Sequence, residues 1–367
     1  MATKNIMVCF DGTCNHPKDA KQERKWFGHG EIEDNGITNV LKLHVLFGGN
    51  LDNTASLPAD KSKGQTEQHS FYYSGVGTYG NKLQKIFNAG FSPEKLDVSR
   101  IIKNAKKDLI KHYQDGDSIY IFGFSRGAAI ARRFACLIGE YISTNDDTPI
   151  KFLGVFDTVA SIGVPNLDDN DKPISDVVFE DNCISPKIEK ALHLLALDEK
   201  RTAFLPTLMQ KEDKVTEIWF PGAHADVGGG FWYDGLSDIA LSFMIDWISK
   251  NQRKVNLQAV SDIDFSNLIA SDGSYAIDDE DITILPNHKG KTHSQDRWWP
   301  IEKATLSTRS VRVETGDGTL PLLHNSVIHR FKDIDGYRPK ALKGVNHKVY
   351  EVTGEFKGLN SHRKLSG

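Results

Sequence analysis

The chain has 367 residues, 26% of them charged and 39% hydrophobic, so it can bury a large core as one α/β domain. Its formal net charge of −4 argues against a nucleic-acid-binding protein that is guided by bulk positive charge. The longest apolar run near the start, residues 6–10, is too short for a signal-peptide core or a membrane span. We therefore expect no transmembrane segment, and synthesis in the cytoplasm without a signal peptide.

Cysteine and acidic residues give no metal-site pattern. The four cysteines contain no C-x-x-C pair, so we expect neither a disulfide framework nor a zinc site. The acidic clusters at 168–171 and 278–281 lack the spacing of a calcium-binding loop and are interpreted as solvated turns.

Strand-like and helix-like segments alternate through the first half of the chain. Buried strands are predicted at 5–10, at 71–74 and through Tyr120, with helices at 37–47 and 94–112. This alternation implies right-handed crossovers and a parallel sheet with helices on both faces.

The second half continues the pattern and then loses it. We expect strands at 151–156 and 214–220 and helices at 184–197 and 236–247. Polar sequence without periodicity follows, and we interpret 251–320 as an insertion or cap. The prediction is a single domain over 1–367, with a doubly wound, mostly parallel α/β sheet and this insertion in its C-terminal third.

The most informative motif is G-x-S-x-G at Gly123, Ser125 and Gly127. An apolar strand leads into it and a helix-like pattern follows, which is the context of a nucleophilic serine on a sharp strand-to-helix turn. The two glycines allow the backbone to turn tightly enough to expose the serine hydroxyl. We therefore predict that Ser125 is a nucleophile.

A nucleophilic serine needs a histidine base that is oriented by a carboxylate. Two aspartates follow predicted strands and are candidate acids, Asp157 and Asp226. The candidate base is His324, which follows an apolar stretch and opens a predicted helix late in the chain. His224 is the rival base, although it shares its strand end with Asp226.

Acyl transfer also needs two backbone N–H groups that bind the oxyanion. One is expected from Arg126, directly after the nucleophile. Counting two strands back places the second in the loop of Asp11, Gly12 and Thr13, where glycine permits a close backbone approach.

The same D-G-T loop has a competing interpretation. A strand followed by D-x-D-G-T is typical of haloacid-dehalogenase phosphatases, in which the first aspartate is the nucleophile. That position is Cys9 in this chain, so we reject the phosphatase interpretation.

Taken together, these residues resemble the type VI secretion lipase effectors of the first class and related bacterial and fungal hydrolases, which have an α/β-hydrolase-like domain. Seven blocks carry the resemblance, in the order of the family: 8–15, 75–78, 123–128, 154–159, 197–201, 220–230 and 324–330. Two departures weaken the inference that the substrate is a lipid. Cys14 stands where relatives often have an aromatic residue, and the chain is shorter than the larger effectors.

The resemblance implies a phospholipase that cleaves glycerophospholipid acyl esters without a cofactor or metal. Its roles fall on Ser125, Asp157 and His324, with Asp226 as second-choice acid or part of the site floor beside His224. It also implies an antibacterial effector that is secreted into the periplasm of target cells, with a delivery protein and an immunity protein as partners.

Two alternatives remain open at this point. One is a cytoplasmic esterase of small soluble esters, which would show no rise in activity when its substrate forms micelles or vesicles. The other is a catalytically silent binding module on the hydrolase scaffold, which a fluorophosphonate would fail to label at Ser125.

Overall fold

The computed structural model describes residues 3–12, 35–75, 94–160, 184–270, 273–293, 306–311, 320–358 and 362. Within these ranges the strands form a ten-stranded sheet in the order β10-β9-β8-β7-β6-β5-β4-β1-β3-β2. The pairs from β3 to β9 are parallel, whereas β2 and β10 are antiparallel to their neighbours. The strands are β1 (Lys4–Phe10), β2 (Ser56–Leu57), β3 (Glu67–Tyr73), β4 (Ser118–Phe124), β5 (Ile150–Phe156), β6 (Ala191–Ala196), β7 (Val215–Phe220), β8 (Leu322–Leu323), β9 (Asn346–Val349) and β10 (Val352–Lys357).

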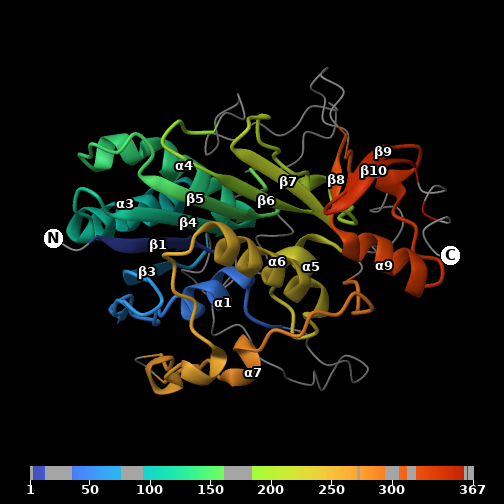
Figure 1. The fold of residues 1–367 in the computed structure, drawn as a ribbon. Helices are drawn as coiled ribbons and strands as arrows, with labels where there is room; N and C mark the ends of the chain where they lie inside the picture. The colour runs from blue at the N-terminus through green and yellow to red at the C-terminus, as the bar shows by residue number, and fades with distance from the viewer. Residues whose placement is uncertain are drawn as a thin grey trace.

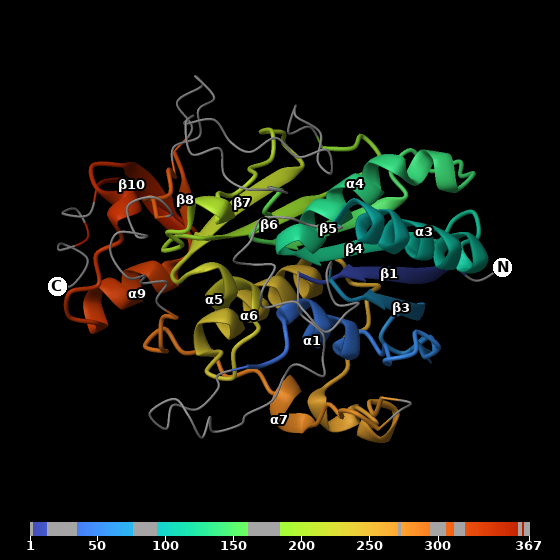
Figure 2. The same ribbon diagram turned by 180° about the vertical axis from the view of Figure 1, so that it is seen from behind.

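Helices cover both faces of the sheet (Figures 1 and 2). α3 and α4 lie on one face, and α1, α5 and α6 lie on the other. The helices are α1 (Asn39–Leu46), α3 (Glu94–His112), α4 (Ser125–Tyr141), α5 (His224–Gly228), α6 (Gly235–Asn251), α7 (Asp279–Ile282) and α9 (Asn325–Asp333). Short 3-10 turns occur at Thr202–Phe204, Val260–Asp262, Phe265–Asn267 and Lys340–Leu342.

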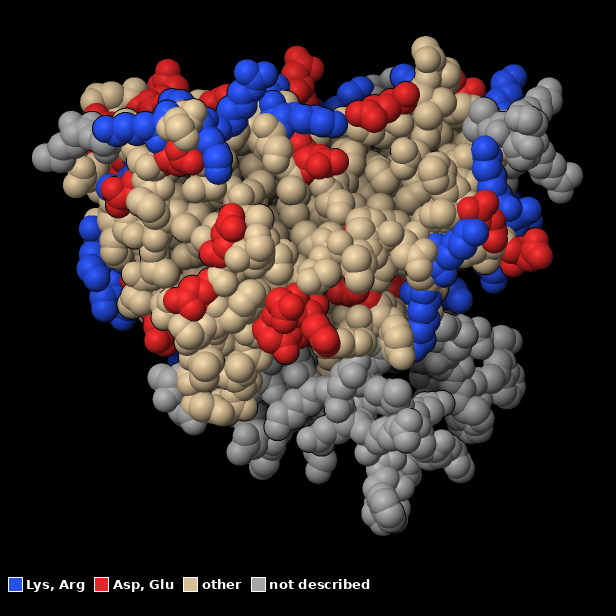
Figure 3. Space-filling model, turned by 60° about the horizontal axis from the view of Figure 1, so that its bottom comes forward, with Lys and Arg blue, Asp and Glu red and all other residues tan. Residues whose placement is uncertain are grey.

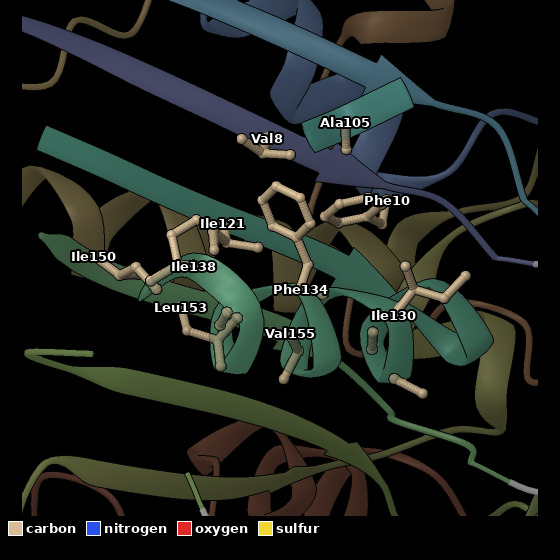
Figure 4. Packing of buried hydrophobic residues seen from close by; sticks show 14 of the residues in the cluster. Val8, Phe10, Ala105, Ile121, Ile130, Phe134, Ile138, Ile150, Leu153 and Val155 are labelled. Atoms are coloured by element: carbon tan, nitrogen blue, oxygen red, sulfur yellow. The ribbon is translucent and has the colours of Figure 1, made fainter. Parts of the chain in front are cut away.

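Side-chain alternation along the strands builds the two cores. In β4, Ile119 and Ile121 pack toward α3 and α4, whereas Tyr120 and Phe122 pack toward α1 and α6. Figure 4 shows Phe134 of α4 among the side chains of β1 and β4 on the first face. Because both faces of the central strands are buried, these strands consist of nearly continuous apolar residues.

Most predicted elements are confirmed, with small shifts at their ends. The exception is the helix predicted at 184–197, where the structure has the strand β6 (Ala191–Ala196). All six residues of β6 are buried, and a short apolar run that is buried on both sides has no periodicity to separate a strand from a helix. The prediction of a helix there was wrong, and the sheet gains one strand between β5 and β7.

The described part of the predicted insertion packs on the helical layer. Leu268, Ile277 and Ile282 contact apolar residues of α1 and its flanks. Among the described residues, no helix is long and apolar enough to cross a membrane. Basic and acidic side chains both occur on the face in Figure 3, with wide uncharged areas between them.

A buried ion-pair cluster joins α1 to α6 and to the turn before it. The Lys42 Nζ lies 2.6 Å from Asp234 Oδ2 and 3.0 Å from Asp238 Oδ1. Lys42 and Asp238 are 1% and 0% exposed, so neither charge is solvated by bulk water. Asp238 also accepts a hydrogen bond from the Leu285 backbone N–H.

Replacing this lysine should destabilise the fold strongly. In Lys42→Met the Asp238 carboxylate stays buried without its cation, so we expect the free energy of unfolding to fall by about 3–5 kcal/mol. Urea-induced unfolding measures this loss. The double variant Lys42→Met/Asp238→Asn should recover part of it, and a loss below about 1 kcal/mol in Lys42→Met would contradict the assigned role.

Candidate active site

The strand-to-helix turn that G-x-S-x-G predicts is present between β4 and α4. Ser125 is the first residue of α4 and has a φ of 57°, in the left-handed region that non-glycine residues rarely adopt. Such strain is costly and concentrates at functional sites. The turn places Ser125 at the carboxyl edge of the sheet, where active sites of open α/β folds are found.

Packing explains both glycines of the motif. A Cβ on Gly123 would lie 2.7 Å from the Ala128 Cα, and a Cβ on Gly127 would lie 2.2 Å from the Asp11 carbonyl oxygen. The second contact shows that the loop after β1 lies against the turn, as the strand count predicted. β1 is the direct neighbour of β4 in the sheet.

The predicted oxyanion donors lie beside this turn, but one already has an acceptor. The Gly12 N–H donates to Asp11 Oδ1 at 2.6 Å. Asp11 Oδ2 accepts from the hydroxyls of Thr38 and Tyr72 at 2.7 and 2.5 Å. Arg126 is the second residue of α4, directly after Ser125. Thr13 lies outside the described residues.

Asp157 follows β5, the strand next to the nucleophile strand. Phe156 pairs with Phe124, and the Val159 N–H donates to the Ser125 carbonyl oxygen at 3.2 Å. Asp157 has a positive φ of 39° and is fully buried. The structure therefore places the predicted acid one strand away from the predicted nucleophile.

The histidine that contacts Asp157 is His224, at the start of α5. Its Nδ1 lies 2.6 Å from Asp157 Oδ2. An ionised carboxylate can only accept, so Nδ1 carries the proton and the neutral ring has its lone pair on Nε2. The ring centroid lies 4.6 Å from that of Phe124, the residue before the nucleophile. Nε2 is buried and has no hydrogen-bond partner among the described residues.

Four charged side chains lie around the His224 imidazole: Asp157, Glu199, Arg201 and Arg309. Burial opposes ionisation of Asp157, but the Arg309 guanidinium and His224 outweigh it and hold the pKa of Asp157 well below its usual range. Burial lowers the pKa of His224, and Asp157 only partly offsets that effect. The result is a neutral imidazole beside an ionised carboxylate, which is the resting state of a general base.

Glu199 holds the His224 backbone in place. Its Oε2 accepts from the His224 N–H at 3.1 Å, and both of its oxygens accept from the Arg201 guanidinium. Burial opposes its ionisation, but Arg201 holds the pKa of Glu199 at about 2. Residues 197–201 form one of the seven blocks that resemble the family. Through Glu199 they hold the start of α5, the helix that carries His224.

Asp226 and His293 form a second acid–histidine pair. The His293 Nδ1 lies 2.6 Å from Asp226 Oδ1, and its ring stacks on Phe231 at 3.6 Å between centroids. Asp226 Oδ2 also accepts the backbone N–H groups of Ala223 and His293, at 2.8 and 3.1 Å. This carboxylate thus ties the first turn of α5 to the segment that contains His293.

The predicted Asp157–His324 pair is not formed. His324 caps α9, where its Nδ1 lies 2.8 Å from the Ser326 hydroxyl and accepts from the Ser326 N–H. Its ring stacks on Phe220, and burial lowers the pKa of His324 to about 4. The helix that His324 opens was predicted correctly, and His324 is its N-cap residue.

Ser125, Asp157 and His224 lie at the carboxyl edge of the sheet, and Asp157 contacts His224. His324 follows β8 at the same edge, where its ring contacts Phe220 and Phe243. No hydrogen bond joins the Ser125 hydroxyl to an imidazole among the described residues, so the base is inferred from the acid–histidine pairs. Sequence reasoning missed His293 and Arg309, because both lie in polar segments without periodicity. Where the chain is described, no cluster of three His, Cys, Asp or Glu side chains is arranged to hold a metal ion.

A family model for the catalytic domain of Tle1-like type VI secretion phospholipase effectors matches residues 4–142 and 140–247. Ser125, Asp157 and His224 lie inside the matched residues, whereas His293, Arg309 and His324 lie beyond them. The uncharacterised Saccharomyces cerevisiae protein YEL023C is 27% identical over a match that covers 55% of this chain and 32% of that protein.

Two solved structures are similar at low identity. An uncharacterised protein from Pseudomonas aeruginosa is 18% identical with a TM-score of 0.44, over 78% of this chain and 49% of that one. The Tle1 effector bound to the VgrG spike of the type VI secretion system is 22% identical with a TM-score of 0.38, over 63% and 51%. The chain thus spans about half the length of these two structural relatives and about a third of the yeast protein.

Desolvation of the partly buried His324 should make folding stability depend on pH. Its pKa of about 4 in the folded protein lies below the usual 6.5, so between these values the unfolded chain binds a proton that the folded chain rejects. We expect the free energy of unfolding to fall between pH 6.5 and pH 4, and to fall less steeply in His324→Gln. Urea unfolding across this range tests this expectation, with His69→Gln on β3, far from His324 in the sheet, as control. Equal slopes in His324→Gln and the wild type would be inconsistent with the burial argument.

Proposed function

We propose that this chain, which belongs to the family of Tle1-like type VI secretion phospholipase effector catalytic domains, is a serine hydrolase that cleaves the acyl esters of glycerophospholipids. The observation that supports this most directly is the Asp157–His224 pair beside the strained Ser125 turn. An acid, a base and a strained serine at one sheet edge are the components of acyl transfer through a covalent intermediate.

In the proposed mechanism His224 Nε2 accepts the Ser125 proton as the hydroxyl attacks the ester carbonyl. Asp157 accepts the Nδ1–H, keeps the ring in this tautomer and stabilises the imidazolium that forms. His224 then donates its proton to the leaving lysolipid. Water repeats the attack on the acyl-enzyme and restores Ser125.

The oxyanion donors remain those that the sequence predicts. The Arg126 N–H lies in the first turn of α4, directly after the nucleophile. The 11–13 loop supplies the second donor in this proposal, because Gly127 lets that loop approach the turn. In this proposal the Gly12 N–H leaves Asp11 Oδ1 and donates to the oxyanion instead.

The assignment of the base replaces His324 with the rival candidate His224. Two findings favour Asp157–His224 over the second pair, Asp226–His293. The His224 ring packs on the residue before Ser125 and has a buried, unpartnered Nε2. Asp226, in contrast, accepts two backbone N–H groups that hold α5, which is a structural role.

The substrate and the delivery route follow from family membership. Lipid esters are proposed as substrates because the family is one of phospholipase effectors. A delivery protein is proposed as partner because the related Tle1 effector is bound to the VgrG spike. Secretion into the periplasm of target cells and a matching immunity protein complete this proposal.

The two acid–histidine pairs provide matched variants for a test on phospholipid vesicles. Ser125→Ala, Asp157→Asn and His224→Gln should each lower fatty-acid release by about 10⁴-fold, because each removes a member of the triad. Asp226→Asn and His293→Gln should keep activity within roughly tenfold, because a hydrogen-bonding side chain remains at both positions.

Two outcomes would change the proposal. Loss of activity in the Asp226 and His293 variants, with activity kept in the other pair, would move the triad to Asp226–His293. Hydrolysis of a soluble short-chain ester without release from vesicles would keep the triad and exclude the phospholipase.

A further inference from the structure

Arg309 reaches the catalytic edge from a segment beyond the residues that the family model matches. The segment 306–311 attaches to the chain after β6, where the Ser307 N–H donates to the Lys200 carbonyl and Leu306 forms an antiparallel bridge with Arg201. Arg309 itself is 2% exposed. A guanidinium at this depth keeps its charge and must be stabilised by the groups around it.

The guanidinium binds Asp157 at both oxygens. Its Nη1 donates to Asp157 Oδ1 at 2.6 Å and its Nη2 donates to Asp157 Oδ2 at 2.8 Å. The same two nitrogens donate to the carbonyl oxygens of Ala196 and Phe204. Arg309 therefore joins the ends of β5 and β6 to the 3-10 turn that carries Phe204, whose ring contacts His224.

The negative charge of Asp157 interacts with two partners, the His224 imidazole and the Arg309 guanidinium. Oδ2 accepts from the imidazole and the guanidinium together, at 2.6 and 2.8 Å. The charged groups around His224 are Asp157 of β5, Glu199 and Arg201 after β6, and Arg309. A cation this close to the carboxylate weakens the attraction of Asp157 for a proton on the imidazole.

We propose that Arg309 is a positioning residue that orients the Asp157 carboxylate and limits how strongly it draws a proton onto His224. The inference rests on the proposed role of Asp157 and His224 in ester hydrolysis. A buried arginine of purely structural function would hold the loops together without changing the titration of the imidazole. This difference allows the two roles to be separated.

The test is a titration of His224 by NMR in the inactive Ser125→Ala protein, with the His224 signal identified by its loss in a Ser125→Ala/His224→Gln sample. Adding Arg309→Met should raise the His224 midpoint by about one pH unit, because the imidazolium loses a neighbouring cation and gains the undivided carboxylate. The control is Arg330→Met, which removes a buried arginine that donates, within the described residues, to carbonyl and hydroxyl oxygens and to no carboxylate. The control should leave the midpoint unchanged.

A His224 midpoint that stays constant or falls in Arg309→Met overturns the proposal. If circular dichroism shows that Arg309→Met does not fold, Arg309→Lys replaces it, because an ammonium keeps the charge but cannot bind both oxygens as a planar fork. A smaller rise is then expected, and no rise overturns the proposal.

The titration requires no turnover, so it separates the two proposals. A shifted midpoint in a protein that hydrolyses no ester would reject the proposed function and keep the role of Arg309. Normal ester hydrolysis by the wild type, together with an unchanged His224 midpoint in the Arg309 variants, would keep the proposed function and reject the role of Arg309.

Discussion

The buried carboxylate of Asp157 is the group on which the rest of the proposed active site depends. It accepts the Ala196 N–H, both terminal nitrogens of Arg309 and the His224 imidazole. These four donors come from β6, from the segment near 309 and from α5, so one carboxylate joins elements that are far apart in the sequence. An ionised group without such partners would not remain charged at this depth.

The cost of burying these charges explains why they occur as a network. Asp157 and Glu199 carry negative charge, and Arg309 and Arg201 each bind one of them. His224 lies between the two pairs, with its ring on Asp157 and its backbone N–H on Glu199. Burial lowers the pKa of His224 and the surrounding charges only partly offset this effect, so the imidazole stays neutral, as the proposed base requires.

Local patterns predicted the parts of the fold that depend on local chemistry. The turn at Ser125 followed from two glycines and a strand, and the structure shows why a side chain at position 127 would collide with the loop after β1. The strand β6 was mistaken for a helix because its residues are apolar on both faces. Buried strands of a parallel sheet lack the alternation that identifies other strands.

The histidine proposed as base was harder to predict, because the choice between histidines depends on contacts between distant segments. His324 follows an apolar stretch and opens a helix, as expected, but that place makes it a helix cap. His224 shares its strand end with Asp226, which made it the rival candidate and not the first choice. In the structure each binds a residue of another segment, Asp157 in one case and His293 in the other. The spacing of residues in a single sequence does not show which aspartate each histidine contacts.

The most direct test of the central claim is covalent labelling by a fluorophosphonate, followed by mass spectrometry of the modified peptide. A serine that is activated by His224 and Asp157 should be labelled at Ser125, and labelling should be much slower in His224→Gln than in His293→Gln. An unlabelled Ser125, or a rate that His224→Gln leaves unchanged, would contradict the account.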